Sequence, residues 1–190
     1  LAAVLGFSLL AFAGNAGLRR MPANAMGALA GPPISVAGLQ GAIYVKFDGV
    51  DGETMDPAHK GWSTALSFDQ AHSGTVSRTS GAGAGRVTFE GLLVTKELDK
   101  ASPKLADGVC KGKVYPTAVI HVTRALGTNS LTYYKYELKN VLVSSYHVSG
   151  TGDAVPVEEL MLSFEEIKVT YTEYDGKGVS KDDTEYTCKT

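Results

Sequence analysis

One helix start stands among segments that otherwise alternate like β-strands, and this contrast most constrains the fold. Ser102 can cap a helix N-terminus, and Pro103 fits the first helical position, where its missing N–H costs nothing. Apolar residues then recur at helical spacing until Gly112, a residue type that commonly ends helices. We therefore predict one short helix over residues 102–112, with Cys110 packed on its inner face.

The segments on both sides of this helix have the alternation of strands, separated by turns rich in Gly, Asn and Asp. The apolar parity shifts near Asn140 and again at Glu165 and Glu166, where a bulge would keep one face buried. Long, bent strands of this kind predict a mainly β fold: an antiparallel β-barrel with one short flanking α-helix. The expected strands are 42–47, 62–71, 87–96, 114–125, 131–149 and 157–174, followed by a short polar strand ending near residue 188.

The first 41 residues differ in composition from the rest of the chain. Residues 1–16 open with LAAVLGFSLLAFA, which is too short to span a bilayer but fits the apolar region of a secretory signal. The alternative is an apolar arm that packs on a neighbouring subunit. Residues 17–41 are rich in Gly, Ala and Pro and predict a linker. We thus expect three parts: 1–16, the linker 17–41, and a barrel domain over 42–190.

Charge and cysteine content exclude several classes of protein. The 18 basic and 20 acidic residues leave a net charge of −2 without a basic stripe, which argues against nucleic-acid binding. Cys110 and Cys188 are the only cysteines, and without CxxC spacing they do not predict a zinc site. Two alternatives remain for them: a disulfide in an oxidising compartment, or two free thiols.

No pattern of catalytic residues appears along the chain. The four histidines fall on separate segments without HxxxH or HExxH spacing, and there is no GxSxG motif. The acidic doublets at 158–159 and 165–166 lie in strand-like segments, where adjacent side chains point to opposite faces. The acidic loop 48–60 lacks the spacing of a calcium-binding EF-hand. We expect a protein that is not an enzyme and has no cofactor or metal.

Four segments, taken in order, resemble the Hcp (hemolysin-coregulated protein) family, the tube component of the bacterial type VI secretion system. They are IYVKFDGVDGETMDPAHKGW (43–62), LDKASPKL (98–105), VLVSSYHVSG (141–150) and VEELMLSFEEIKVTY (157–171). The resemblance covers about residues 42–190. It implies a homohexameric ring, rings stacked into a hollow tube, and spike, sheath or effector proteins as partners.

Within such a tube, stacking should use loops at the barrel ends. We expect the loops 48–60 and 73–85 to serve, with Asp51, Glu53, Asp56 and Lys60 making polar contacts. The apolar N-terminal segment predicts a secreted protein without a stable membrane span; the alternative is cytoplasmic assembly followed by secretion. Two other functions stay open: an exported tube or filament outside a type VI machine, and a secreted carrier for a small protein.

Overall fold

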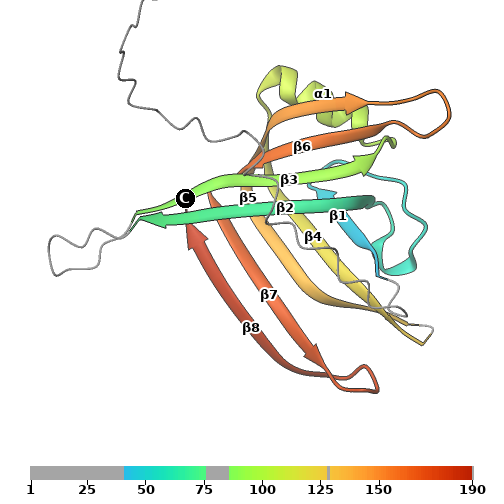
Figure 1. Cartoon of the computed structure of the whole chain (residues 1–190), viewed down its shortest axis with the longest axis vertical. Coiled ribbons are helices and arrows are strands. Elements are labelled where there is room, and N and C mark those ends of the chain that lie inside the picture. Colours follow the sequence, from blue (N-terminus) through green and yellow to red (C-terminus); the bar gives the residue numbers. More distant parts are fainter. Residues whose placement is uncertain (1–40, 76–85, 128, 190) are drawn as a thin grey trace, which may run out of the picture. The chain divides into compact units, whose positions relative to one another are not determined.

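The computed structural model describes residues 41–75, 86–127 and 129–189, and Figure 1 shows their arrangement. The expected N-terminal segments at 1–16 and 17–40 lie outside these residues. The elements in chain order are β1 (Ile43–Phe47), the short 3-10 helix η2 (Pro57–His59), β2 (Ser63–Thr75), β3 (Arg86–Glu97), α1 (Ser102–Lys111), β4 (Val114–Leu126), β5 (Asn129–Ser149), β6 (Val157–Ser163), β7 (Glu166–Tyr174) and β8 (Ser180–Lys189).

Six of the strands close into an antiparallel barrel. Their order is β4-β1-β2-β3-β6-β5, and β5 pairs with β4 to complete the circuit. The β7–β8 hairpin continues the sheet from β5 and projects away from the barrel, as Figure 1 shows. The predicted barrel with one short helix is therefore confirmed, and the hairpin is a second feature attached to it.

The barrel interior is filled by side chains from alternate strand positions, as the pleat of a strand requires. Leu92, Ile120, Leu138 and Leu162 are fully buried and come from four different strands. Phe47 and Tyr115 meet edge to face, with ring centroids 5.5 Å apart. The barrel interior is thus a packed apolar core.

Helix α1 begins at Ser102, so the prediction that this residue caps the helix is wrong. Ala101 occupies the N-cap position with helical dihedral angles and no side-chain hydrogen bond to the helix. Ser102 Oγ instead accepts the backbone N–H of Asp99 at 3.0 Å and a hydrogen bond from Lys96 Nζ at 3.3 Å. The predicted end is confirmed, because Gly112 takes left-handed dihedral angles there.

The prediction that Cys110 faces inward is also wrong, since its side chain is exposed. Leu105 and Gly108 are buried against the barrel, and successive helix positions turn by about 100°. Cys110 lies five residues after Leu105 and therefore points well away from the buried stripe. Cys188, on β8, is half-buried, and both cysteines are free thiols in the structure.

The two predicted irregularities occur and lie side by side. Asn140 has a φ of 51°, which bends β5. The expected single strand 157–174 is two strands instead, because the chain breaks between β6 and β7 at residues 164–165. Asn140 Nδ2 donates to Glu165 Oε2 at 2.7 Å, and the Glu165 N–H donates to the Lys139 carbonyl at 3.0 Å. These bonds hold the break between the two strands. Before the break, β6 pairs with β3, and after it, β7 pairs with β8.

The expected loop 73–85 is shorter than predicted at its start. Residues 73–75 belong to β2 and pair with the beginning of β3. Residues 76–85, the remainder of that loop, lie outside the described residues.

Candidate functional site

The loop between β1 and β2 carries all four residues expected to mediate stacking; residues 48–60 are called the stacking loop below. Its ends are joined by backbone hydrogen bonds, from the Gly52 N–H to the Gly61 carbonyl at 2.9 Å and from the Thr54 N–H to the Trp62 carbonyl at 2.9 Å. Lys46 Nζ also bonds the Gly61 carbonyl at 2.8 Å. These contacts give the loop one defined conformation.

Asp56 organises the turn at the middle of the stacking loop. Its Oδ1 accepts the backbone N–H groups of Ala58 and His59, both at 3.0 Å, which caps η2. The same oxygen lies 2.7 Å from His59 Nδ1. The hydrogen bond from His59 holds the pKa of the Asp56 carboxyl below its usual range, so this side chain is ionised near neutral pH.

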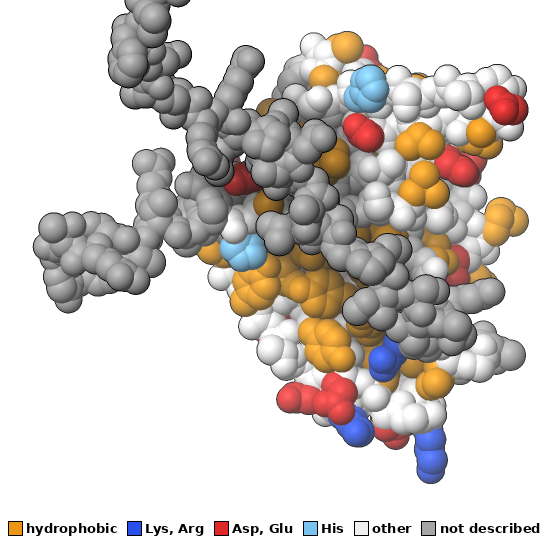
Figure 2. Space-filling view, in the orientation of Figure 1, with side chains coloured by type: hydrophobic (Ala, Val, Ile, Leu, Met, Phe, Trp, Pro, Cys, Tyr) orange, Lys and Arg blue, Asp and Glu red, His pale blue; other side chains and the backbone are white. Residues whose placement is uncertain are grey.

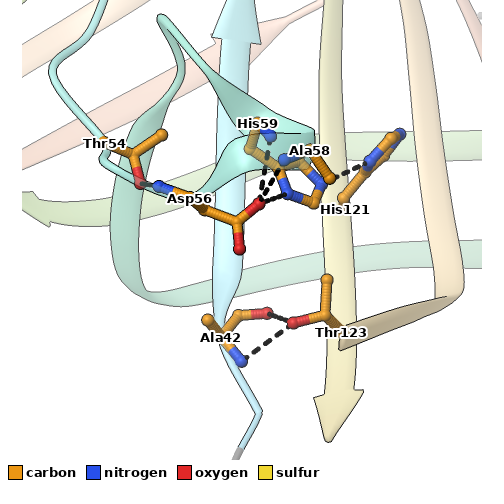
Figure 3. A network of polar contacts seen from close by, with 7 residues as sticks. All are labelled: Ala42, Thr54, Asp56, Ala58, His59, His121 and Thr123. Carbon is orange, nitrogen blue, oxygen red and sulfur yellow. Dashed lines mark hydrogen bonds and ion pairs between the residues drawn. The ribbon is translucent and has the colours of Figure 1, made fainter. Parts of the chain in front are cut away.

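His59 links this turn to the barrel wall, as Figure 3 shows. Its ring is buried and stacks on Tyr44 with centroids 4.0 Å apart. Its Nε2 lies 3.0 Å from Nδ1 of His121 on β4. Burial, followed by the nearby His59 and Lys135, lowers the pKa of His121 from 6.5 to about 4. The sequence places these two histidines 62 positions apart, and only the pairing of β1 with β4 brings them together.

The four predicted stacking residues do not behave alike. Asp51 is bonded to Lys46 at 2.6 Å, and Asp56 is bonded to His59, so both carboxylates are used within the subunit. Glu53 and Lys60 are exposed and form no ion pair within the described part of the chain. Glu53 and Lys60 are therefore the better placed of the four for contacts with another molecule.

Met55 is a surface residue of the stacking loop that sequence reasoning missed. Its side chain is 94% exposed, the most of the large apolar side chains described on the surface. A single exposed apolar side chain is ordinary on a protein surface, so its exposure makes Met55 available for a contact without requiring one. Its position within an acidic, turn-rich loop was the only available signal in the sequence.

A second surface lies where β2 passes the β7–β8 hairpin, and Figure 2 shows hydrophobic side chains gathered on this face. Phe68, Tyr136, Tyr134 and Tyr171 form a continuous row of ring contacts, called the aromatic row below. Adjacent centroids along it are 5.2, 5.2 and 6.4 Å apart. Tyr171 at the end of the row is 41% exposed, so the row is only partly covered.

Two strand edges beside this row have no pairing partner among the described residues. β8 is the last strand of the sheet, and its outer edge runs over ten residues. β2 pairs with β1 only through Ser63, Thr64 and Ala65, which leaves its later part open on that side. Unpaired strand edges are sites where another chain can add a strand.

A buried charged cluster supports the end of the barrel next to α1. Lys96 Nζ lies 2.6 Å from Glu158 Oε1 and 2.7 Å from Asp99 Oδ1, with Lys96 and Glu158 fully buried. Tyr146 donates a hydrogen bond to Glu158 Oε2 at 2.7 Å. The contact between Lys96 and Glu158 Oε1 is an ion pair that lies outside hydrogen-bond angles. The cluster joins β3, β5 and β6 to the segment that leads into α1.

The described residues form no group of three or more histidine, cysteine or acidic side chains that could hold a metal ion. In the same part of the chain, no helix has the length and apolar character needed to cross a membrane.

Comparisons with known proteins identify the family. Residues 44–171 match the family model described as "Type VI secretion system effector, Hcp". The chain belongs to the Hcp family. It is similar to protein hcp1 of Pseudomonas aeruginosa, with 33% identity over 132 residues that cover 68% of this chain and 82% of that protein.

Solved structures agree with this family. One titled as a type six secretion system protein is 31% identical, covers 76% of this chain and 92% of its own, and has a TM-score of 0.69. Hcp1 of Salmonella typhimurium is 29% identical and covers 77% and 93%, with a TM-score of 0.60. The chain is thus an Hcp protein of type VI secretion, and Hcp is a family of secreted, structural tube proteins.

Proposed function

We propose that this Hcp protein builds homohexameric rings that stack into a hollow tube, and that each ring closes through the free edges of β8 and β2. The observation that carries the proposal is the pair of open edges beside the aromatic row, which ends at the exposed Tyr171. A ring requires two different surfaces on each subunit, because its contacts are head to tail. The outer edge of β8 and the open part of β2 are two such surfaces.

The β7–β8 hairpin supports this role because it is poorly covered in a single subunit. Nine of the ten residues of β8 are exposed, and eight of them form an unbroken run from Ser180 to Thr187. A strand this exposed is a liability in a monomer unless another chain covers it. Addition of a neighbouring strand would satisfy its backbone groups and bury Tyr171 and Tyr186, which are 41% and 43% exposed.

Stacking of one ring on the next is assigned to the stacking loop. Met55 would insert into the adjoining ring, while Glu53 and Lys60 would add polar contacts at the rim. Exposed ion pairs contribute about 0–1 kcal/mol each, so the polar contacts alone would be weak and sensitive to salt. Weak stacking suits a tube that must assemble and later come apart.

Native mass spectrometry of the full chain tests ring formation. The wild type should give a hexamer, and Tyr171→Lys should shift the population to monomers because it places a charge in the interface. Val179→Lys is the matched control, since Val179 is 61% exposed in the turn of the same hairpin. Hexamers from Tyr171→Lys at wild-type abundance would contradict the assigned interface, and wild-type monomers at all concentrations would contradict the ring.

The route of secretion and the partners of the tube belong to the same proposal. Spike, sheath and effector proteins are the expected partners, and secretion through the type VI system is the expected route. Export by an N-terminal signal, with assembly of a filament outside that system, is the alternative that the apolar composition of residues 1–16 favours. Sequencing the N-terminus of the secreted protein separates these routes, since signal cleavage after Ala16 would leave Gly17 first.

A further inference from the structure

The contact between His59 and His121 depends on how many protons the two rings carry together. A carboxylate only accepts, so His59 Nδ1 must carry the proton that bonds Asp56 Oδ1. When both rings are neutral, His59 Nε2 then accepts from the Nδ1–H of His121 across 3.0 Å. One added proton on His59 is still compatible with contact, because His59 can donate to Asp56 and to His121 at once.

A second added proton is not compatible with this geometry. Both rings would then present N–H donors to each other across 3.0 Å, with no acceptor between them. Two positive charges at this distance also repel strongly where water is partly excluded. His59 is buried between Tyr44 and Trp62 and cannot turn away without moving η2, so the strain falls on the stacking loop.

The other groups around His121 do not remove this conflict. Lys135 pairs with it across β4 and β5 and adds a positive charge, while Glu137 favours its protonated form only weakly. Thr170 of β7 and Asp183 of β8 line the same cavity of about 260 Å³ beside His121. From β1, Tyr44 faces it in register, and the Asp56 carboxylate lies beyond His59 on the stacking loop.

We propose that the Asp56–His59–His121 chain is an acid-sensitive latch, which holds the stacking loop on the barrel wall and releases it when both imidazoles are protonated. The consequence for the tube rests on the proposed stacking role of this loop. In acid the released loop would no longer hold Met55 and Glu53 in place. The rings would therefore lose their stacking contacts before the subunits unfold. The latch itself is a property of one subunit and can be measured without a tube.

Trp62 reports on the latch directly. It is the single tryptophan of the chain, and its ring lies 5.1 Å from His59 and 4.6 Å from His121 between centroids. Protonated imidazole quenches indole emission on contact. In the full-length protein, emission should show a step as the pH falls through about 4, where His121 gains its proton. Far-UV circular dichroism over the same range should stay constant.

Two variants and a second readout complete the experiment. His121→Gln should abolish the emission step, whereas His147→Gln should keep it, because His147 is exposed on a distant part of β5. In parallel, amide exchange of residues 54–62 should accelerate in acid in the wild type. A step that persists in His121→Gln, or loop amides that stay protected through the step, would overturn the latch. If His121→Gln does not fold, the amide exchange of the wild type alone tests the latch.

Tube images over the same pH series separate the latch from the proposed function. Tubes that shorten into rings at the pH of the emission step support both. Tubes that persist while emission and loop exchange both change would leave the latch standing and contradict stacking by this loop. Rings or tubes that never form would contradict the proposed function, and the emission step would still decide the latch.

Discussion

The side chains of Lys96, Glu158 and Asp99 show how a charged cluster can be tolerated at the edge of an apolar core. Each charge has a partner within 2.7 Å, and Tyr146 satisfies the remaining Glu158 oxygen. Removing one partner from such a cluster leaves an uncompensated buried charge. We therefore expect that loss of one charge from this cluster strongly lowers the free energy of unfolding.

Lys96→Met should lower the free energy of unfolding by about 3–5 kcal/mol, because it strands the Glu158 carboxylate in the core. The double variant Lys96→Met with Glu158→Leu should recover a large part of that loss, since it removes both buried charges. Urea denaturation of the monomeric Tyr171→Lys background gives these energies without interference from assembly. Equal losses for the single and double variants would contradict the ion-pair account.

The lowered pKa of His121 leads us to expect that the folded protein loses stability in acid. Its folded pKa of about 4 is below the ordinary 6.5, so between these values the unfolded chain binds more protons than the folded one. Stability is therefore full above pH 6.5, decreases as the pH falls to about 4, and changes no further through this group below that. Because the ring is half-exposed, the contribution is about 1–2 kcal/mol.

The measurement is urea denaturation at neutral pH and near pH 4, in the same monomeric background. His121→Gln should lose less stability on acidification than the parent protein by that amount, while His147→Gln should match the parent. An identical acid loss in the parent and in His121→Gln would show that other groups carry it.

Met55 makes a prediction about stacking. Met55→Glu should leave hexameric rings intact and reduce tube length in electron micrographs, since it charges the tip of the stacking loop. Met55→Leu, which keeps an apolar side chain of similar volume, should form tubes of normal length. Normal tubes from Met55→Glu would remove Met55 from the stacking contact.

At the scale of elements, α1 depends on one close approach to β4. A Cβ added at Gly108 would clash with the hydroxyl oxygen of Tyr115, whose side chain is fully buried. Tyr115 also donates a weak hydrogen bond to the Lys104 carbonyl at 3.3 Å. Glycine at this position is therefore required by packing rather than by helix geometry, and the helix tolerates its lower propensity.

Gly108→Ala should lower the free energy of unfolding by about 1–3 kcal/mol, because the added methyl group overpacks this contact. Tyr115→Phe removes the clashing hydroxyl and alone should cost about 0.5–1.5 kcal/mol, for the lost hydrogen bond. In the double variant the two changes should be less than additive. Additive losses would show that the clash is relieved in another way.

The sequence predicted the elements better than it predicted their partners. Alternation located the starts of β1 to β6 to within a few residues, and Gly112 located the end of α1, because these signals are local. The N-cap of α1 was misassigned because Ser102 bonds Lys96, a partner contributed by β3. The break at residues 164–165 was seen only as a parity shift, since splitting the strand requires that β6 and β7 have different neighbours.

The candidate site was predicted less completely. Stacking was expected at the loops 48–60 and 73–85, yet the link between His59 and His121 joins residues that no local pattern relates. The aromatic row has the same character, because Phe68 meets Tyr136 only when the barrel closes. Contacts that arise from closure of a sheet leave no periodic trace in the sequence.

At the scale of the whole molecule, the barrel is closed while the hairpin beside it is open. Closure pairs the six barrel strands except along the later part of β2, and β8 carries the other edge without a pairing partner among the described residues. The same arrangement leaves Tyr171, at the end of the aromatic row, 41% exposed. In the ring that we propose, a neighbouring subunit would cover these surfaces.

Amide hydrogen exchange on the assembled wild type and on monomeric Tyr171→Lys tests this account most directly. The backbone amides of β8 and of residues 66–75 in β2 should exchange slowly in the ring and quickly in the monomer, while the barrel core is protected in both. Exchange at these two edges that is equally fast in ring and monomer would contradict ring closure through β8 and β2.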